Sequence, residues 1–344
     1  MKNILVPGGA GYIGSHTIVE LIAAGYRPVI IDDFSNSKKQ VLDRLKELTG
    51  QNITCYEHDF SDRDFLRDVM TKESIDGVIH FAAFKAVGES VENPLKYYHN
   101  NVAGLVTLLE VMEEAGVNDL VFSSSCVLYG DALKLPITED EPIKPAASPY
   151  GTTKQMDETV IRDTSAASDT LRSLTLRYFN PIGAHPSSKI GELPLGIPSC
   201  LVPYITQTVA GIRQQLTVHG DDYPTPDGTC IRDYIHVVDL AKAHVKALAY
   251  LDKQKPGSYS YCNLGTGQGS SVLEVINTFE KVTGEKVPYK IGPRRAGDVI
   301  TAYAAVDKAH DMLGWKTELM LGDALLDAWH WQESLKQTLD LSSS

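Results

Sequence analysis

Tyr150 and Lys154 lie four residues apart in the stretch SPYGTTKQMDE, which covers residues 148–158. Ser148 is a favourable N-cap and proline suits the first helical position, so Tyr150 falls in the first turn of a helix, with Lys154 one turn later on the same face. A free phenol titrates near pH ~10 and needs roughly 4 kcal/mol of stabilisation to serve as a base at neutral pH. An adjacent ammonium group and a helix N-terminus both lower its pKa. The pair can therefore be a general base or an ordinary pair on a solvated helix face.

A glycine-rich loop, PGGAGYIGSH, follows the first apolar run of the chain. Its glycines, including Gly8, Gly11 and Gly14, permit a tight turn and bring a pyrophosphate close to backbone N–H groups at a helix N-terminus. Asp32 ends the next β-rich run about 20 residues further on, where a carboxylate binds the adenosine ribose hydroxyls. Asp33 beside it would repel a 2′-phosphate. The motif therefore favours NAD over NADP, and the alternative is a glycine-rich turn with an unrelated aspartate.

The elements that must position these residues follow an alternating pattern. Six β-rich runs alternate with helical stretches through residue 180: NILV, PVIID, ITCYEHD, DGVIHFA, DLVFSSS and SLTLRYFN. This pattern predicts an α/β fold with a doubly wound parallel sheet, so residues 1–180 are expected to form a Rossmann domain that binds NAD. Prolines punctuate residues 181–203, which predicts a smaller, loop-rich substrate domain over 181–344, with segments near 234–265 crossing back onto the sheet.

Composition restricts the class of protein. The 344 residues carry a net charge of -12, which disfavours binding to nucleic acid or to anionic membranes. The N-terminus lacks the apolar core of a signal peptide, and no stretch approaches the ~18 apolar residues that a membrane span requires. The five cysteines are scattered without CxxC spacing, so we expect no metal site and no disulfide framework. A cytoplasmic enzyme with a small-molecule substrate is the simplest interpretation.

Together, the glycine loop, the serines 123–125 at a strand end and the Tyr150–Lys154 pair resemble the extended short-chain dehydrogenase/reductases, and more narrowly the UDP-glucose 4-epimerase family. The narrower resemblance rests on stretches that follow the family order over nearly the whole chain: GGAGYIGSH, VIHFAAFKAVGESVENPLKYYHNNV, SPYGTTK, RYFNPIGAHPS, RDYIHVVDLA, YCNLGTG and PRRAGDV. It implies a bound NAD, a role in galactose metabolism, and interconversion of UDP-glucose and UDP-galactose through oxidation at C4, rotation of the 4-keto sugar and re-reduction.

The resemblance also assigns roles to individual residues. Tyr150 would take the proton of the sugar 4-hydroxyl, Lys154 would hold the nicotinamide ribose and lower the phenol pKa, and Ser125 would hydrogen-bond the reacting oxygen. Beside Tyr150 and Lys154, the implied cofactor-binding residues are Gly8, Gly11, Tyr12, Ile13, Gly14, Asp32, Asn36, Ser37, Asp59, Phe60, Phe81, Ala82, Lys85, Asn100, Ser123 and Tyr178. Beside Ser125 and Tyr150, the implied substrate-binding residues are Asn180, Cys200, Leu201, Thr217, His219, Arg232, Tyr234, Arg295, Asp298 and Ala302. Arg232 and Arg295 would bind the pyrophosphate, because forked guanidinium groups match phosphate oxygens.

Four positions depart from the family pattern. Pro7 stands where the family usually has Thr, Cys200 where it has Asn, and His219 where an aromatic carbocycle is expected beside the uracil. Ala302 occupies the position where strict glucose/galactose enzymes carry Tyr. Because a small residue there leaves room for an N-acetyl group, the resemblance implies activity on UDP-N-acetylglucosamine and UDP-N-acetylgalactosamine as well, provided that a one-residue slip does not place Tyr303 there.

The same pattern suggests a homodimer and leaves two rival functions. Met156 and Val160 lie off the active face of their helix, and the stretch VAGLVTLLEVMEEAG is apolar on more than one side. In the family that the chain resembles, these two helices pair across a two-fold axis.

A nucleotide-sugar 4,6-dehydratase needs an acid and a base directly after the strand-end hydroxyl residue, but Cys126 and Val127 stand there. A non-catalytic NAD-binding regulator would have no use for Ser125, Tyr150 and Lys154 together.

Overall fold

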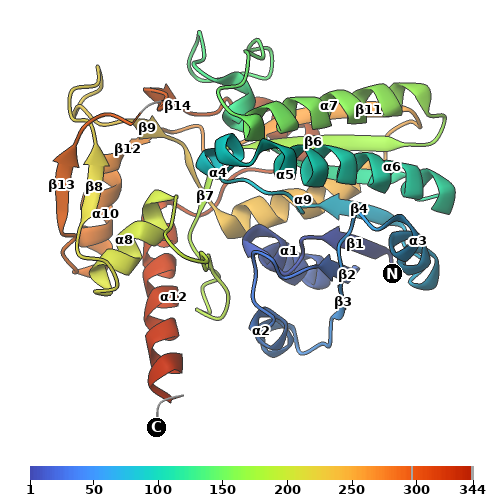
Figure 1. Ribbon diagram of the computed structural model, residues 1–344, viewed down its shortest axis with the longest axis horizontal. Coiled ribbons are helices and arrows are strands. Elements are labelled where there is room, and N and C mark those ends of the chain that lie inside the picture. The colour runs from blue at the N-terminus through green and yellow to red at the C-terminus, as the bar shows by residue number, and fades with distance from the viewer. Residues whose placement is uncertain (296, 342–344) are drawn as a thin grey trace.

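A seven-stranded parallel sheet with its helices forms the larger part of the molecule (Figure 1). The computed structural model describes residues 1–295 and 297–341, with side chains through residue 335. Its strand order is β11-β6-β5-β4-β1-β2-β3. Most strands are buried on both faces, as expected for parallel strands covered by helices. In that order the strands are Ser258–Leu264, Arg172–Tyr178, Asp119–Ser125, Gly77–His80, Asn3–Pro7, Arg27–Asp32 and Thr54–Glu57.

Helices cover both faces of the sheet. One face packs against α1 (Tyr12–Ala23), α2 (Gln40–Thr49), α9 (Val237–Leu251) and α11 (Asp307–Leu313). The other packs against α3 (Arg63–Lys72), α6 (Gly104–Ala115) and α7 (Pro149–Ala167). Two short helices, α4 (Val87–Glu92) and α5 (Pro94–Tyr97), and a π-helical segment (Tyr98–Ala103) lead into α6. The predicted α/β doubly wound fold is therefore confirmed.

The smaller region has its own apolar core, built around α8 (Leu201–Val209), α10 (Val272–Thr283) and the start of α12 (Leu321–Leu341). Short paired strands surround it: β8 (Leu216–His219) with β13 (Tyr289–Gly292), β7 (Asn180–Ile182) with β10 (Tyr234–His236), and β9 (Ile231–Arg232) between β12 (Ser270–Ser271) and β14 (Thr301–Ala302). Between β10 and β12 the chain returns to the large sheet through α9 and β11. A division into domains at residue 180 remains a prediction.

The helix that carries the Tyr–Lys pair begins where the sequence predicts. The Ser148 side chain accepts a hydrogen bond from the backbone N–H of Gly151, and a proline occupies the first turn of α7. Both features fix where the helix starts, so they also fix which residues fall in its first turn. None of the helices in the described ranges is long and apolar enough to cross a membrane.

Candidate active site

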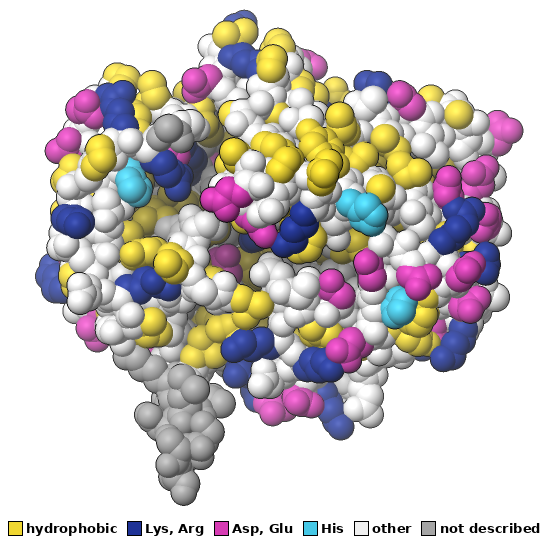
Figure 2. All heavy atoms as spheres, viewed as in Figure 1, with side chains coloured by type: hydrophobic (Ala, Val, Ile, Leu, Met, Phe, Trp, Pro, Cys, Tyr) yellow, Lys and Arg dark blue, Asp and Glu magenta, His cyan; other side chains and the backbone are white. Residues whose placement is uncertain are grey.

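A cavity of about 1110 Å³ opens between the carboxyl ends of the sheet strands and the smaller region, where the surface in Figure 2 is hollowed. Its volume exceeds the ~300–1,000 Å³ typical of a pocket for one ligand, so it has room for a cofactor and a substrate together. Every residue that the sequence assigned to the cofactor or the substrate lines this cavity except Ala302. The carboxyl end of a parallel sheet is the usual ligand site in such folds.

The glycine loop joins β1 to α1 along one wall of the cavity. Gly8 has a φ of +77°, and a Cβ on it would meet the backbone nitrogen of Ala82 at 2.7 Å. A Cβ on Gly14 would lie 2.4 Å from the carbonyl oxygen of Gly8. No described side chain caps α1, whose N-cap is Gly11, so the first backbone N–H groups of the helix remain available to an anion. The loop therefore fits the pyrophosphate of a dinucleotide.

Asp32 lies at the end of β2, beside this loop. One carboxylate oxygen accepts a hydrogen bond from the N–H of Ala10 at 3.0 Å, and the other accepts from the N–H of Phe34 and from Ser37 Oγ, both at 2.9 Å. Burial raises the pKa of Asp32, and these hydrogen bonds oppose the increase. The carboxylate is thus held rigidly at the place expected for a ribose acceptor.

Tyr150, Lys154 and Ser125 meet where β5 ends beside α7. Lys154 Nζ donates to the carbonyl oxygen of Ser123 at 3.0 Å and lies 4.5 Å from the centre of the Phe122 ring. Burial raises the pKa of Tyr150 above its ordinary value, and the facing hydroxyl of Ser125 acts to lower it. A buried phenol needs a nearby positive charge to become a base. Lys154, one turn after Tyr150 on the same helix, carries such a charge.

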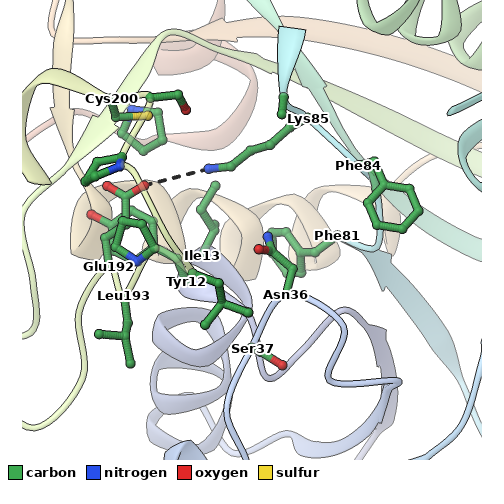
Figure 3. Close-up of a pocket in the computed structure, with 18 of the residues that line it drawn as sticks. Tyr12, Ile13, Asn36, Ser37, Phe81, Phe84, Lys85, Glu192, Leu193 and Cys200 are labelled. Atoms are coloured by element: carbon green, nitrogen blue, oxygen red, sulfur yellow. Dashed lines mark ion pairs between the residues drawn. The ribbon is translucent and has the colours of Figure 1, made fainter. Parts of the chain in front are cut away.

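Opposite walls of the cavity are joined by an ion pair (Figure 3). Lys85, in the loop after β4, lies with its Nζ 3.9 Å from Glu192 Oε1, and Glu192 belongs to the proline-rich segment of the smaller region. Burial raises the pKa of Glu192, while Lys85 lowers it, and the Cys200 thiol faces the same carboxylate. Sequence reasoning missed Glu192, because a single acid inside an irregular loop carries no periodic or motif signal.

The two candidate phosphate-binding arginines share one carboxylate. Arg295 donates to Asp298 through Nε at 3.1 Å and Nη2 at 2.7 Å, while Arg232 Nη2 lies 3.7 Å from Asp298 Oδ1. Two guanidinium groups around one carboxylate leave a net positive charge in this part of the cavity. That charge suits a diphosphate, although the protein as a whole is acidic.

Ala302 does not line the cavity. It pairs in register with Arg232, which does, but its side chain is 6% exposed and packs in a cluster with Tyr129, Ile137, Phe179 and Ala304. The neighbouring Tyr303 does not line the cavity either, and its ring lies 3.3 Å from where a Cβ on Gly269 would be. Ala302 therefore lies in the layer behind the cavity lining, and its role in substrate binding stays a prediction.

Comparisons with known proteins show the family to which the chain is similar. A family model described as GDP-mannose 4,6 dehydratase matches residues 5–327. A UDP-glucose 4-epimerase of Bacillus subtilis is 53% identical over 96% of this chain and 97% of its own length.

Two solved structures are similar over nearly their whole length. The UDP-glucose 4-epimerase of Stenotrophomonas maltophila, with bound NAD and formylated UDP-arabinopyranose, has a TM-score of 0.95 at 47% identity and covers 98% of this chain and 100% of its own. The enzyme from Bifidobacterium longum, in complex with NAD+ and UDP, has a TM-score of 0.92 at 45% identity and covers 97% of this chain and 98% of its own.

Proposed function

The chain belongs to the UDP-glucose 4-epimerase family, and from this premise we propose that it interconverts UDP-glucose and UDP-galactose at the cavity described above. The observation that carries the proposal is the convergence of the glycine loop, the Tyr150–Lys154 pair and the two arginines on one cavity. Each of the three supplies a different requirement of the reaction: a dinucleotide site, a base and a diphosphate site. The level of identity to the Bacillus subtilis relative supports the same activity.

The cofactor is NAD, and the chain's own residues fit it. The loop at Gly8 and Gly14 admits close backbone approach, and Asp32 offers a fixed carboxylate to ribose hydroxyls while disfavouring a 2′-phosphate. Bound NAD supplies the hydride acceptor at C4 and, in the second half of the reaction, the hydride donor. Phe60 and Asp59 are proposed to flank the adenine, and Lys85 and Asn100 to line the cleft beside the cofactor.

Tyr150 is proposed as the base that takes the proton of the 4-hydroxyl and later returns it. Burial raises the pKa of the phenol, and we propose that Lys154, one turn later on the same helix, supplies the positive charge that opposes this increase. Ser125 faces the phenol of Tyr150 and lines the same cavity, and its hydroxyl is proposed to hold the reacting oxygen. All three side chains are fixed by α7 and the end of β5, which are regular elements rather than mobile loops.

Substrate binding is proposed to depend on Arg232 and Arg295. When a UDP-sugar binds, its diphosphate can accept hydrogen bonds from both guanidinium groups and weaken their contacts with Asp298. Leu201, Thr217 and His219 lie nearby for the nucleoside, and Asn180 and Tyr234 for the sugar side of the diphosphate. His219 contacts the carbonyl oxygen of Pro293 at 3.3 Å, which holds its ring at the cavity rim.

A 4,6-dehydratase is the second candidate, since the matching family model carries that description. Elimination of water requires a proton donor and a proton acceptor near C5 and C6. Cys126 and Val127 occupy the turn that follows Ser125, and burial raises the pKa of the Cys126 thiol to about 12. Neither side chain can shuttle protons at neutral pH, so the epimerase is favoured.

We propose that the protein is located in the cytoplasm. We also propose that it forms a homodimer. Exposed apolar side chains lie on the active-site helix and on the helices that precede it: Val87 and Val91 on α4, Leu95 on α5, Val106 on α6 and Met156 on α7. Figure 2 shows hydrophobic side chains gathered over this part of the surface. A second copy of the chain would cover them, and a two-fold axis would bring α6 and α7 of the two copies together.

The test is turnover of UDP-galactose by purified protein without added NAD. We expect UDP-glucose to accumulate to equilibrium with no net NADH, because the cofactor is reoxidised in every cycle. Formation of a 4-keto-6-deoxy sugar would identify a dehydratase, and NADH produced in proportion to the substrate consumed would identify a dehydrogenase. Absence of turnover with bound NAD would favour a regulator.

A further inference from the structure

Asp157 is a buried acid with no assigned role, one turn after Lys154 on α7. Its side chain is 1% exposed, and Oδ1 has no hydrogen-bond partner among the described residues. Oδ2 lies 3.8 Å from Lys154 Nζ. Buried carboxylates are normally hydrogen-bonded or paired, since an uncompensated buried charge costs several kcal/mol. The lysine is therefore the feature that explains an acid at this place.

Lys154 needs such a partner. Its side chain is 6% exposed, and its other close contacts are the carbonyl oxygen of Ser123 and the face of Phe122, neither of which carries a formal charge. Burial lowers the pKa of Lys154, and Asp157 and Glu158 oppose that effect. A buried ammonium group without an anion readily loses its proton.

Glu158 is also close to Lys154, but its charge is already engaged by another cation. Its carboxylate accepts three hydrogen bonds from Arg177, the shortest at 2.6 Å, and one from Ser124 Oγ at 2.6 Å. Its charge is therefore already balanced by a guanidinium group. Asp157 has no such competitor, because Lys154 is the cation recorded beside it in the described part of the chain.

The other titratable groups around the pair come from every element that packs on this part of α7. Two of them, Tyr150 and Glu158, belong to α7 itself, and Cys126 follows β5. His80, on β4, faces Lys154. Glu158 accepts hydrogen bonds from Arg177 on β6 and from Tyr259 on β11. On α4 and α5, Glu89 is paired with Lys96 and with the hydroxyl of Tyr97. Burial lowers the pKa of His80 to about 3, so its ring is neutral at working pH.

We propose that Asp157 is a positioning residue whose carboxylate is the counter-ion that keeps the buried ammonium group of Lys154 protonated beside Tyr150. The inference rests on the catalytic pair of the proposed function. Burial raises the pKa of Asp157, and the ammonium group of Lys154 beside it opposes that increase. The two groups stabilise each other's charged forms, so loss of the carboxylate would lower the pH at which the buried lysine loses its proton. Asp157 therefore extends to higher pH the range over which Lys154 can assist the phenol.

The test compares pH profiles of kcat for UDP-galactose from pH 6 to pH 10, using the NAD-containing enzyme. Asp157→Asn keeps the shape and removes the charge, and the alkaline limb should move to lower pH by about one pH unit or more. At pH 9 we expect kcat to fall about tenfold or more, with a smaller change at pH 6.5 and little change in KM. Asp157→Glu keeps the charge and should restore the wild-type limb.

Two further variants complete the design. Asp157→Leu places an apolar side chain of comparable size at the buried site, so an uncharged variant remains available if Asp157→Asn does not fold, and it should show the same alkaline shift. Asp163→Asn, an exposed acid on the same helix paired with Arg162, is the matched control and should leave the profile unchanged. Folding and bound NAD are checked by circular dichroism and by cofactor content.

The outcomes separate this inference from the proposed function. An unshifted alkaline limb in the folded uncharged variants would overturn it. A shift of the acid limb alone to lower pH would also overturn the inference. In that case the only effect of Asp157 would be to weaken the attraction between Lys154 and the phenolate. Tyr150→Phe is assayed in parallel: if that variant keeps full activity, the base assignment itself fails, whereas an inactive Tyr150→Phe with an unshifted Asp157→Asn limits the failure to Asp157.

Discussion

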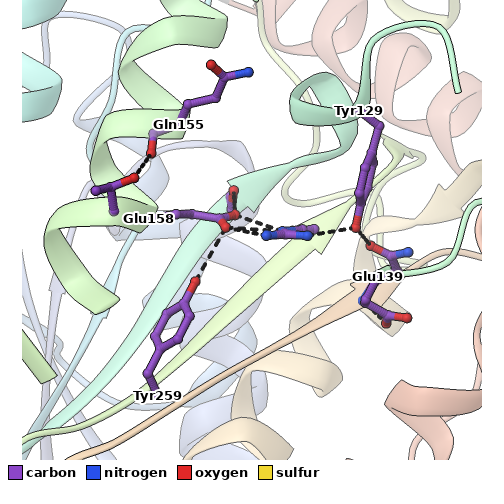
Figure 4. Close-up of polar contacts among 9 residues, drawn as sticks. Tyr129, Glu139, Gln155, Glu158 and Tyr259 are labelled. Atoms are coloured by element: carbon purple, nitrogen blue, oxygen red, sulfur yellow. Dashed lines mark hydrogen bonds and ion pairs between the residues drawn. The ribbon is translucent and has the colours of Figure 1, made fainter. Parts of the chain in front are cut away.

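Arg177 and Glu158 form a buried ion pair that joins β6 to the helix carrying Tyr150 (Figure 4). Arg177 Nη2 donates to Glu158 Oε2 at 2.6 Å, and both residues are 4% exposed. The pair extends in both directions, since Ser124 donates to Glu158 and Arg177 Nη1 donates to the hydroxyl of Tyr129. Ser124 immediately precedes Ser125, so this network fixes the end of β5 relative to α7.

Removing one member of this pair should destabilise the fold. Glu158→Gln leaves a buried guanidinium group without its anion, and we expect a loss of about 3–5 kcal/mol in the free energy of unfolding. Urea unfolding followed by circular dichroism measures it. Asp163→Asn removes an acid from an exposed pair on the same helix and should cost less than about 1 kcal/mol. Equal losses in the two variants would show that the buried pair has no special role.

Tyr150→Phe should abolish most of the activity while NAD stays bound. The substitution deletes only the ionisable oxygen, and a positioned general base contributes about 10²–10⁴-fold to the rate. Turnover of UDP-galactose and NAD content are measured on the same preparation. A loss smaller than about tenfold would assign the base role to another group. Lys154→Met should reduce activity comparably, because the phenol pKa would then rise.

The sequence predicted those parts of the site whose geometry depends on residues close together in the chain. The start of α7 follows from Ser148 and the proline after it, and the glycine loop follows from close backbone approach at Gly8 and Gly14. These features depend on neighbours in sequence, so a single chain reveals them. The positions of the residues at the carboxyl ends of the sheet strands then follow from the α/β topology, which brings these strand ends together.

Contacts between distant elements could not be predicted in this way. The pairing of Lys85 with Glu192 depends on how an irregular loop folds over the sheet, and no periodicity encodes it. The balance among Lys154, Asp157 and Glu158 depends on which acid Arg177 occupies. The placement of Ala302 behind the cavity depends on the register of a two-residue strand, and a shift of one residue there would reverse which side chain faces inward.

Acid should destabilise the protein partly through His80. Burial lowers its pKa to about 3, from an ordinary value near 6.5, so folding disfavours its protonated form. Its contribution is therefore complete above about pH 6.5 and is lost as the pH falls toward the folded value. Between pH 7 and pH 5 the loss is about 2 kcal/mol. His80→Leu should reduce the acid-induced drop in unfolding free energy by that amount, whereas His330→Leu, at an exposed site, should leave the drop unchanged.

Leu95→Glu should separate the proposed dimer. Leu95 is 81% exposed on α5, beside the other apolar side chains of α4, α6 and α7, so a carboxylate there would be buried against the second copy. Light scattering at micromolar concentration should give a dimer for the wild type and a monomer for the variant. Ile212→Glu changes an equally apolar, 59% exposed residue near α8 and should leave the dimer intact. A monomeric wild type would contradict the proposal.

Substrate breadth depends on the cluster behind the cavity. Ala302 packs with Tyr129 and Phe179 next to Cys126, which directly follows Ser125, so it lies behind the region proposed for the sugar. A tyrosine at 302 cannot fit within this buried cluster without moving toward the cavity, and overpacking of this kind costs about 1–3 kcal/mol. We therefore expect the small side chain to keep this cluster out of the space that an N-acetyl group at C2 would require.

We expect the wild type to interconvert UDP-N-acetylglucosamine and UDP-N-acetylgalactosamine as well as the unsubstituted sugars. Ala302→Tyr should lower kcat/KM for the N-acetylated substrate by at least tenfold relative to UDP-glucose, because the phenol ring would take the space of the acetyl group. Tyr303→Phe, at the neighbouring residue outside the cavity lining, is the control and should affect both substrates equally and slightly. A wild type without activity on the N-acetylated sugar, or an equal loss on both substrates in Ala302→Tyr, would assign specificity to another part of the cavity.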